Sequence, residues 1–310
     1  MEPTPTLALA VVVPVLNEEE HLPKLLESIA GQTHPPEQLV LVDDGSSDRS
    51  REIADTFVSA HSWASALALP ARPREHDRLA AAAELRAFLK GVEHLREPWD
   101  VVVKLDADLI LARELFQAMR TRFMADPCLG IAGSHLSVRS RGGRLVPEHR
   151  PAGHVLGPNK FYRRACFEQI APIPPILGWD TIDDLRARLG GWRTENVRLA
   201  SEESVHLRAM GSHDGAVRAF RRWGRCAWGY GAHPLWVGLG AIYRMARRPY
   251  VVGGLNYAIG WVDSALHRRP RAEAAVRARA KREEMRDLRA RSARLLRPPW
   301  ALSREVRSKA

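Results

Sequence analysis

The sequence contains little cysteine, and its three cysteines are far apart. Cys128, Cys166 and Cys226 form no C-x-x-C pair and are odd in number. They therefore supply neither a disulfide framework nor a cysteine-based metal site. We expect a chain that works in a reducing cytoplasm.

Long hydrophobic runs are also missing. No stretch of about 18 uninterrupted apolar residues occurs, so the sequence contains no clear membrane span. The apolar segment at residues 7–16, LALAVVVPVL, is short, contains a proline and has no basic residue before it. We interpret this segment as a buried first strand and not as a signal peptide.

Excess positive charge is nearly absent from most of the chain. Of the net charge of +11, residues 268–310 contribute +10, with 15 Lys and Arg against 5 Asp and Glu. Residues 1–267 contribute only +1, with 32 basic and 31 acidic residues. The basic tail is where an anionic partner is expected, and we favour an anionic membrane contacted peripherally. We expect no nucleic-acid partner, because no basic platform interleaved with aromatic residues is present.

Predicted strands and helices alternate in the first part of the chain. The strand at 7–16 is followed by an amphipathic helix at 17–32, which Gly31 ends. Further elements are expected at 38–48 (strand and loop), 50–60 (helix), 84–95 (helix) and 100–109 (strand). This alternation predicts an α/β fold with a mostly parallel sheet flanked by helices.

The pattern becomes less regular after residue 112. We expect a helix at 112–126, one strand at 130–140, a Gly- and Pro-rich loop at 141–159 and a short helix at 180–191. Two apolar segments, 234–246 and 250–261, are separated by Arg-Arg-Pro, and a charged helix is expected at 271–297. The predicted domains are 1–230, an apolar helical segment at 231–270 and a basic helical tail at 271–310. For the segment at 231–270 we favour a position at a membrane interface, and the alternative is a helical subdomain that packs on the core.

Two aspartates, Asp106 and Asp108, end the apolar run VVVKLDADL. Residues i and i+2 of a strand point to the same face, so the two carboxylates are expected to lie together and to repel each other. A hard divalent cation, Mg²⁺ or Mn²⁺, relieves this repulsion and can link the carboxylates to a diphosphate. The alternative is a pair of loop residues that caps the next helix.

The first two predicted strands also end in polar residues. Asn17 and Glu18 follow the first strand, where they suit the start of a helix. Asp43 and Asp44 follow the second strand, and neighbouring residues point in opposite directions. One of the two is therefore expected to face a ligand, while the other serves the turn.

Together, these strand ends are a pattern that resembles the family-2 glycosyltransferases of the GT-A fold. The matching stretches are VVVPVLNEEEHLPKLLESIAGQT, LVLVDDGSSDRS and VVVKLDADL, in this order and spacing. Downstream, GPNKFYRRACFEQI and GWDTIDDLRARLGGWRT resemble the acceptor-side half of that family. The resemblance covers roughly residues 7–215, and it implies an inverting transferase that uses a nucleotide-sugar donor.

The resemblance also implies roles for particular residues. Those implied to hold the nucleotide sugar are Pro14, Asn17, Glu18, Asp44, Arg78 and Asp106. Arg78 departs from the family pattern, because the usual asparagine is missing from its segment. Asp106 and Asp108 would hold the metal and the diphosphate, and His206 would be a third metal ligand, ahead of His213. Mg²⁺ or Mn²⁺ would stabilise the departing nucleoside diphosphate as a Lewis acid.

An inverting transfer needs a base for the proton of the acceptor hydroxyl. The candidates are Asp180, Asp183 and Asp184 in the segment GWDTIDDLRAR. Counting back from Gly191 favours Asp180, whereas counting from the Asp-Leu pair favours Asp183 or Asp184. We rank Asp180 first and Asp183 second, and at least one of the three is expected to be only an acidic residue at a helix start.

The sequence therefore predicts a metal-dependent glycosyltransferase that acts on a glycan or lipid-linked acceptor. The resemblance further implies a role in exopolysaccharide or cell-surface glycan synthesis, and we expect the protein at the inner face of the cell membrane. Two alternatives are a catalytically idle scaffold that binds nucleotide sugar or glycan, and a membrane-binding module driven by the basic tail. A processive synthase is disfavoured, because Ala219 stands where its Gln-x-x-Arg-Trp element has glutamine.

Overall fold

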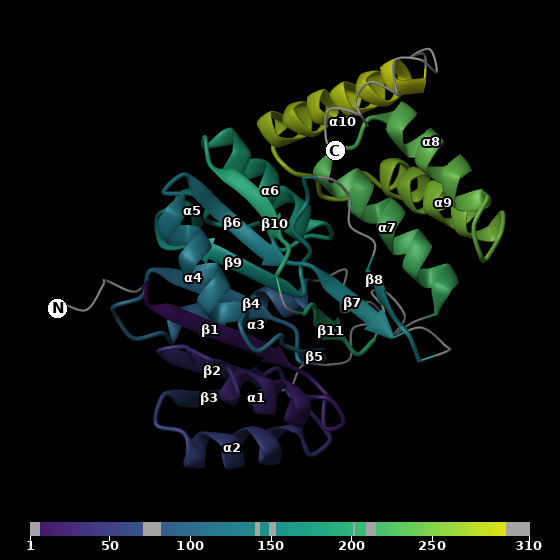
Figure 1. Cartoon of the computed structure of the whole chain (residues 1–310). Helices are drawn as coiled ribbons and strands as arrows, with labels where there is room; N and C mark the ends of the chain where they lie inside the picture. Colours follow the sequence, from purple (N-terminus) through teal and green to yellow (C-terminus); the bar gives the residue numbers. More distant parts are fainter. Residues whose placement is uncertain are drawn as a thin grey trace. The chain divides into compact units, whose positions relative to one another are not determined.

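The computed structural model of the chain describes residues 7–70, 82–139, 143–148, 153–200, 202–208 and 215–295. The chain divides into two compact units, Met1–Gly215 and Ala216–Ala310 (Figure 1). Each unit has its own packed elements and is described by itself. The predicted division at residues 230 and 270 stays a prediction.

A seven-stranded sheet forms the centre of the first unit, with the strand order β10-β6-β9-β4-β1-β2-β3. Its strands are β1 (Leu9–Val15), β2 (Gln38–Asp43), β3 (Ala64–Ala68), β4 (Val101–Leu105), β6 (Leu129–Ser134), β9 (Asn159–Arg163) and β10 (Arg193–Val197). Strand β9 runs antiparallel to β4 and β6, and the other pairs are parallel. The predicted α/β fold with a mostly parallel sheet is confirmed.

Helices cover both faces of this sheet, which explains why its central strands β1 and β4 are apolar apart from Lys104. One face packs against α1 (Leu22–Ala30), α2 (Ser50–Ala60) and α4 (Leu115–Ala125). The other face packs against α3 (Ala83–Glu93), α5 (Arg164–Ile170) and α6 (Trp179–Leu189). Strand β1 divides its side chains accordingly, with Leu9 and Val11 on the first face and Ala10 and Val12 on the second. Gly91 of α3 allows the close approach, because a Cβ there would lie 2.3 Å from Cγ1 of Val12.

A second sheet of four short strands brings together residues that are far apart in the sequence. Its order is β5-β11-β7-β8, with β5 (Leu109–Ile110), β7 (Leu136–Arg139), β8 (Leu145–Pro147) and β11 (Ser204–His206). Strand β11 pairs antiparallel with β5, which sets His206 opposite Leu109. The small sheet therefore joins the segment after Asp108 to a segment near the end of the unit.

Several predicted boundaries were wrong. The single strand expected at 130–140 is divided at His135 into β6 and β7, which belong to different sheets. Part of the expected loop at 141–159 forms β8. The first helix begins at Leu22 and not at Asn17, because Asn17 has a φ of 53° and accepts a hydrogen bond from the Ser47 amide at 2.7 Å.

The second unit is helical. It contains α7 (Ala216–Tyr230), α8 (Pro234–Met245), α9 (Val252–Leu266) and α10 (Ala274–Leu295). Helices α7 and α9 pack closely, since a Cβ on Gly224 would lie 2.0 Å from the carbonyl oxygen of Tyr257. None of the helices in the described part of the chain has the length and apolar character that a membrane crossing requires.

Candidate active site

Asp106, Asp108 and His206 gather at the end of β4. Each offers one ligand atom, and these atoms lie within 4.8 Å of one another. The strand ends at Leu105, so the two aspartates do not share a strand face as expected. They converge instead in the turn between β4 and β5, and the pairing of β11 with β5 adds the histidine.

This cluster fits a divalent cation of the Mg²⁺ or Mn²⁺ type. Two carboxylates supply hard oxygen ligands and the imidazole supplies a nitrogen. The Nε2 atom of His206 lies 3.4 Å from Oδ1 of Asp108, while its Nδ1 lies 2.9 Å from Oε2 of Glu148. A carboxylate on the far nitrogen of a metal-binding histidine is the usual arrangement, because it fixes the direction of the ring. Glu148 lies in the expected loop, and nothing in its local sequence pointed to it.

Arg208 connects this cluster to the end of β1. Its Nε donates to Oδ2 of Asp108 at 2.9 Å, and its guanidinium contacts Oε1 of Glu18. Burial raises the pKa of Asp108, but hydrogen bonds from His206 and Arg208 outweigh it and bring this pKa to about 2. Burial raises the pKa of Glu18. Among the described residues, the buried Oε2 of Glu18 has no hydrogen-bond partner.

The expected nucleoside residues lie at the ends of two neighbouring strands. Pro14 pairs with Val42 between β1 and β2, and the Asp44 amide donates to the Val15 carbonyl at 2.9 Å. Asp44 is buried. Its neighbour Asp43 serves the turn as expected, because its Oδ1 accepts from the Ser46 amide at 3.0 Å.

Asn17 and Glu18 follow β1, so the strand pairing places them close to Asp44 along the same sheet edge. Arg78 and His213 lie outside the described residues. The donor-binding roles expected of all these residues stay predictions.

Lys104 is a buried cation beneath the aspartates. Its ammonium forms ion pairs with Asp106 and Glu84, and it donates to the Gly157 carbonyl at 3.0 Å. The sequence analysis missed this residue, although a single charge inside the apolar run VVVKL was a visible signal. A buried charge is costly unless it is paired, so Lys104 holds these groups at defined positions.

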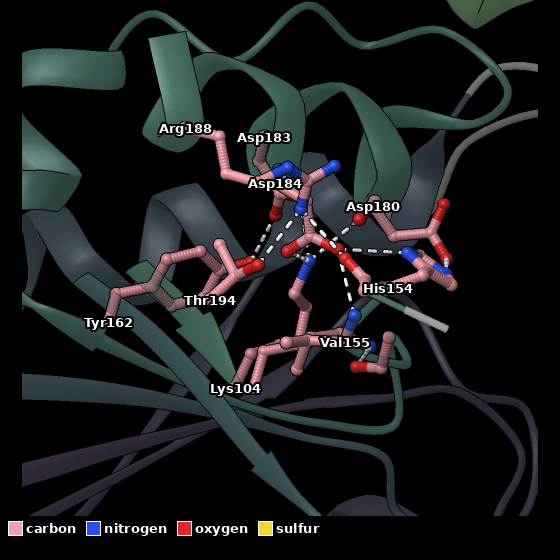
Figure 2. Close-up of polar contacts among 12 residues, drawn as sticks. Lys104, His154, Val155, Tyr162, Asp180, Asp183, Asp184, Arg188 and Thr194 are labelled. Atoms are coloured by element: carbon pink, nitrogen blue, oxygen red, sulfur yellow. Dashed lines mark hydrogen bonds and ion pairs between the residues drawn. The ribbon is translucent and has the colours of Figure 1, made fainter. Parts of the chain in front are cut away.

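Asp183 and Asp184 of α6 are fully buried in a hydrogen-bonded cluster with residues of β9. Lys160 lies 2.6 Å from Oδ1 of Asp183 and 3.1 Å from Oδ1 of Asp184. Tyr162 donates its hydroxyl to Oδ2 of Asp183 at 2.6 Å, and the Val155 amide donates to Oδ2 of Asp184 at 2.8 Å. Their oxygens are thus occupied by contacts within the fold (Figure 2).

The environments of these two buried acids push their pKa values apart. Burial raises the pKa of Asp183 to about 7, against the opposing effect of Lys160. For Asp184, burial acts in the same direction, but Lys160 and His154 outweigh it and lower its pKa. This is the behaviour of a tightly packed charge network, in which one lysine faces two carboxylates.

Asp180 differs from the other two acids because its side chain is 31% exposed. Its Oδ2 lies 3.6 Å from Nε2 of His154, whose Nδ1 lies 2.9 Å from Oδ2 of Asp184 (Figure 2). Burial opposes ionisation, but the nearby positive charge of His154 brings the pKa of Asp180 to about 2. Burial lowers the pKa of His154, but Asp180 and Asp184 outweigh it and raise this pKa to about 9. At neutral pH, Asp180 is therefore an accessible, ionised carboxylate.

Gly157 connects the two clusters. Its carbonyl accepts from Lys104, which also binds Asp106, and a Cβ on Gly157 would lie 3.5 Å from Oδ2 of Asp180. Asp106, through Lys104, and Asp180 thus both border this one residue. The candidate metal ligands and the accessible acid lie next to the same backbone segment.

A sheet of this topology, with aspartates at the end of its central strand, defines a GT-A-type α/β protein. Residues 10–176, more than half of the chain, match the family model described as Glycosyl transferase family 2. The chain belongs to that family, whose members are nucleotide-sugar glycosyltransferases.

Curated relatives share only part of the chain. The undecaprenyl-phosphate 4-deoxy-4-formamido-L-arabinose transferase of Pseudomonas aeruginosa is 38% identical over 112 residues, which are 35% of this chain and 30% of that protein. The protein of the same name from Pectobacterium carotovorum is 38% identical over 105 residues, or 33% and 29% of the two chains. The match thus spans less than a third of these relatives.

Solved structures share the fold over most of the chain. A mannosyltransferase from Pyrobaculum calidifontis, in complex with GDP-Man and Mn²⁺, has a TM-score of 0.54 at 15% identity and covers 96% of this chain and 83% of its own. GalNAc-T7 with UDP, GalNAc and Mn²⁺ has a TM-score of 0.55 at 12% identity, with coverage of 87% and 56%. At these identities, the likeness supports the GT-A fold alone.

Proposed function

We propose that this protein transfers a glycosyl group from a nucleotide-sugar donor to an acceptor hydroxyl, with inversion at the anomeric carbon. The observation that carries this proposal is that Asp106, through Lys104, and Asp180 both border Gly157. A site for a metal and diphosphate thus adjoins an accessible carboxylate, as a direct displacement requires.

Asp106, Asp108 and His206 would hold Mg²⁺ or Mn²⁺, which neutralises the charge that develops on the departing nucleoside diphosphate. The acids at the other strand ends, Glu18 and Asp44, accept hydrogen bonds from the nucleoside. Lys104 holds Asp106 in place from below through their ion pair.

Asp180 accepts the proton of the acceptor hydroxyl as its oxygen attacks the anomeric carbon. Its exposure and ionised state at neutral pH support this role, whereas Asp183 and Asp184 are fully buried and bonded to Lys160. His154 orients the carboxylate of Asp180 through one ring nitrogen. Asp184 holds the other ring nitrogen and so fixes the direction of the ring. Asp183 and Asp184 then act by holding helix α6 and His154, not by touching substrate.

The acceptor is a hydroxyl group of a glycan or of a lipid-linked sugar. Partial sequence similarity to transferases named for undecaprenyl phosphate supports a lipid-linked acceptor. The corresponding process is exopolysaccharide or cell-surface glycan assembly at the inner face of the cell membrane.

The first experiment is calorimetric titration of the protein with UDP, GDP and their sugars, with and without Mn²⁺. Metal-dependent binding of one nucleotide sugar, followed by formation of free nucleoside diphosphate when acceptor is added, is the expected result. Donor binding without any nucleoside diphosphate formed on a panel of lipid-linked sugar and glycan acceptors would favour the alternative of an idle scaffold. The retained acids at 106, 108 and 180 argue against that alternative.

A further inference from the structure

Helices α8 and α9 of the second unit turn their large apolar side chains outward. On α8 the exposed residues are Leu235, Leu239, Ile242 and Tyr243. On α9 they are Val252, Leu255, Ile259, Val262 and Leu266. Successive residues in each set are three or four positions apart, except for the adjacent Ile242 and Tyr243. Each set therefore forms one stripe along its helix. We call these two stripes together the outer face of α8–α9.

The inward side of the same helices is built mainly from small residues, with Val237 and Tyr257 as its larger members. A Cβ on Gly254 of α9 would lie 2.2 Å from the Ala241 carbonyl oxygen of α8, and a Cβ on Gly260 would lie 2.0 Å from the Arg221 carbonyl oxygen of α7. The helices approach so closely that no larger residue fits between them. Water-soluble helices normally do the reverse and bury their large apolar side chains. Small residues between helices and large apolar residues outside them are typical of packing against lipid.

The charge around the outer face has one sign. Residues 234–269 contain five arginines, Arg244, Arg247, Arg248, Arg268 and Arg269, and a single acid, Asp263. That acid is already paired, since its carboxylate lies 3.5 Å from Arg269 and 3.7 Å from Arg221. Arg247 and Arg248 are exposed at one end of the hairpin, and Arg268 and Arg269 are exposed after the end of α9. The apolar stripes therefore run between two cationic ends.

We propose that the outer face of α8–α9 docks the protein onto the surface of an anionic lipid bilayer. The apolar stripes enter the acyl boundary, and the arginines at both ends bind headgroup phosphates. Tyr243 and Tyr250 are exposed on the same hairpin, and aromatic residues of this kind favour the interface level. At 15 residues, α9 is about 22 Å long, less than the roughly 30 Å of a bilayer core, so the hairpin lies on the membrane without crossing it.

A second copy of the chain is a poorer occupant of this face. Two copies related by a twofold axis would bring their arginine-rich ends toward each other with only Asp263 to offset them, and like charges in an interface are costly. An anionic bilayer matches both the apolar stripes and the positive ends. The purpose of this docking, access to a lipid-linked acceptor, rests on the proposed function, but the binding itself does not.

The test is sedimentation of the full chain with phosphatidylcholine vesicles, with and without phosphatidylglycerol. The wild type is expected to bind the anionic vesicles and to bind less as salt increases. The double variant Ile242→Glu/Leu266→Glu alters the two most exposed residues of the face, at 64% and 76%, and should lower binding by about tenfold or more. The variant Arg247→Ser/Arg248→Ser should lower binding to anionic vesicles by about tenfold and leave binding to neutral vesicles unchanged.

The matched control is Met124→Glu/Leu189→Glu, which places the same charges at exposed apolar positions of the first unit, at 42% and 39%. It should bind vesicles like the wild type. Equal loss in the control, or a wild type that ignores anionic vesicles, overturns the proposal. A second contradicting outcome would be a wild-type dimer, detected by light scattering, that Ile242→Glu/Leu266→Glu dissociates while its vesicle binding stays unchanged.

Calorimetric titration with the nucleotide serves as a separate readout. Failure of the proposed function would abolish donor binding and leave vesicle binding intact.

Discussion

The imidazole of His154 lies 3.6 Å from the carboxylate of Asp180, with Nε2 facing Oδ2. The other ring nitrogen lies 2.9 Å from the buried carboxylate of Asp184, so the ring is held from behind. Three acids that look alike in the sequence thus have different positions. Asp180 is accessible, Asp184 orients the histidine, and Asp183 pairs with Lys160.

Replacing His154 by Gln should change the pH dependence of transfer. Burial alone raises the pKa of Asp180, and the nearby cation of His154 is the main effect that lowers it to about 2. Without the cation, this pKa should rise by about one unit or more, so that Asp180 becomes protonated at a higher pH. The acid limb of the kcat profile should move upward by the same amount, to about pH 3 or above, with near-normal activity at pH 8. An unchanged acid limb would show that His154 does not control the charge of Asp180.

Asp180→Asn should lower the rate of transfer, whereas Asp183→Asn should lower the stability of the fold. Asp180→Asn removes the proposed base and should lower kcat by about 100-fold or more, with donor binding and stability unchanged. Asp183→Asn breaks a buried pair with Lys160 and should cost about 3 kcal/mol in the free energy of unfolding, because the lysine keeps only Asp184. Single-turnover kinetics and denaturant unfolding measure the two effects. If Asp183→Asn stops transfer in a fully stable protein, Asp183 is the base and our ranking is wrong.

Asp106→Ala and Asp108→Ala should each abolish Mn²⁺-dependent donor binding. Each removes one ligand from a cluster of three whose ligand atoms lie within 4.8 Å, and the nucleoside diphosphate then loses its bridge to the protein. Calorimetry with the nucleotide measures the loss, and circular dichroism checks the fold. The control is Asp55→Ala, which removes an exposed acid of α2 that pairs only with its helix neighbour Arg51 among the contacts of the described residues. Turnover like that of the wild type in either site variant would refute the metal assignment.

Glu284→Gln should stabilise the second unit above neutral pH. Burial raises the pKa of Glu284 from 4.5 to about 7, against the hydrogen bond that it accepts from the His233 amide at 2.7 Å. The folded state therefore holds this proton more tightly than the unfolded state, and stability falls as the pH rises from 4.5 through 7. The full loss is at most about 3 kcal/mol.

Gln keeps the amide contact of Glu284 without a charge, so the variant should gain stability at pH 8 and none at pH 4. Thermal unfolding of the full chain at both pH values measures this difference. Glu283→Gln, at the neighbouring and less buried position, is the control. A gain of equal size at both pH values would mean that the charge of Glu284 is not the cause.

Much of the donor side could be predicted from local sequence. Apolar strands with polar residues at their ends indicate parallel βαβ units, and parallel strands meet at one edge, so Glu18, Asp44 and Asp106 were expected to lie near one another. The place of Asp106 and Asp108 was predicted for the wrong reason, because β4 ends before both. The turn that joins them depends on pairing with β11, about a hundred residues further on, and local patterns carry no such information.

The sequence by itself determined the α/β class, the family and the residue types needed for metal binding and proton transfer, because these depend on periodicity and on side-chain chemistry. Only the tertiary structure decided which of Asp180, Asp183 and Asp184 is accessible, since their partners Lys160, Tyr162 and His154 come from other segments. It also decided that the large apolar residues of α8 and α9 point outward. Composition gives the number of such residues. The direction in which they point is set by the glycines, because the glycine face of each helix packs against its neighbours and leaves the large residues outside.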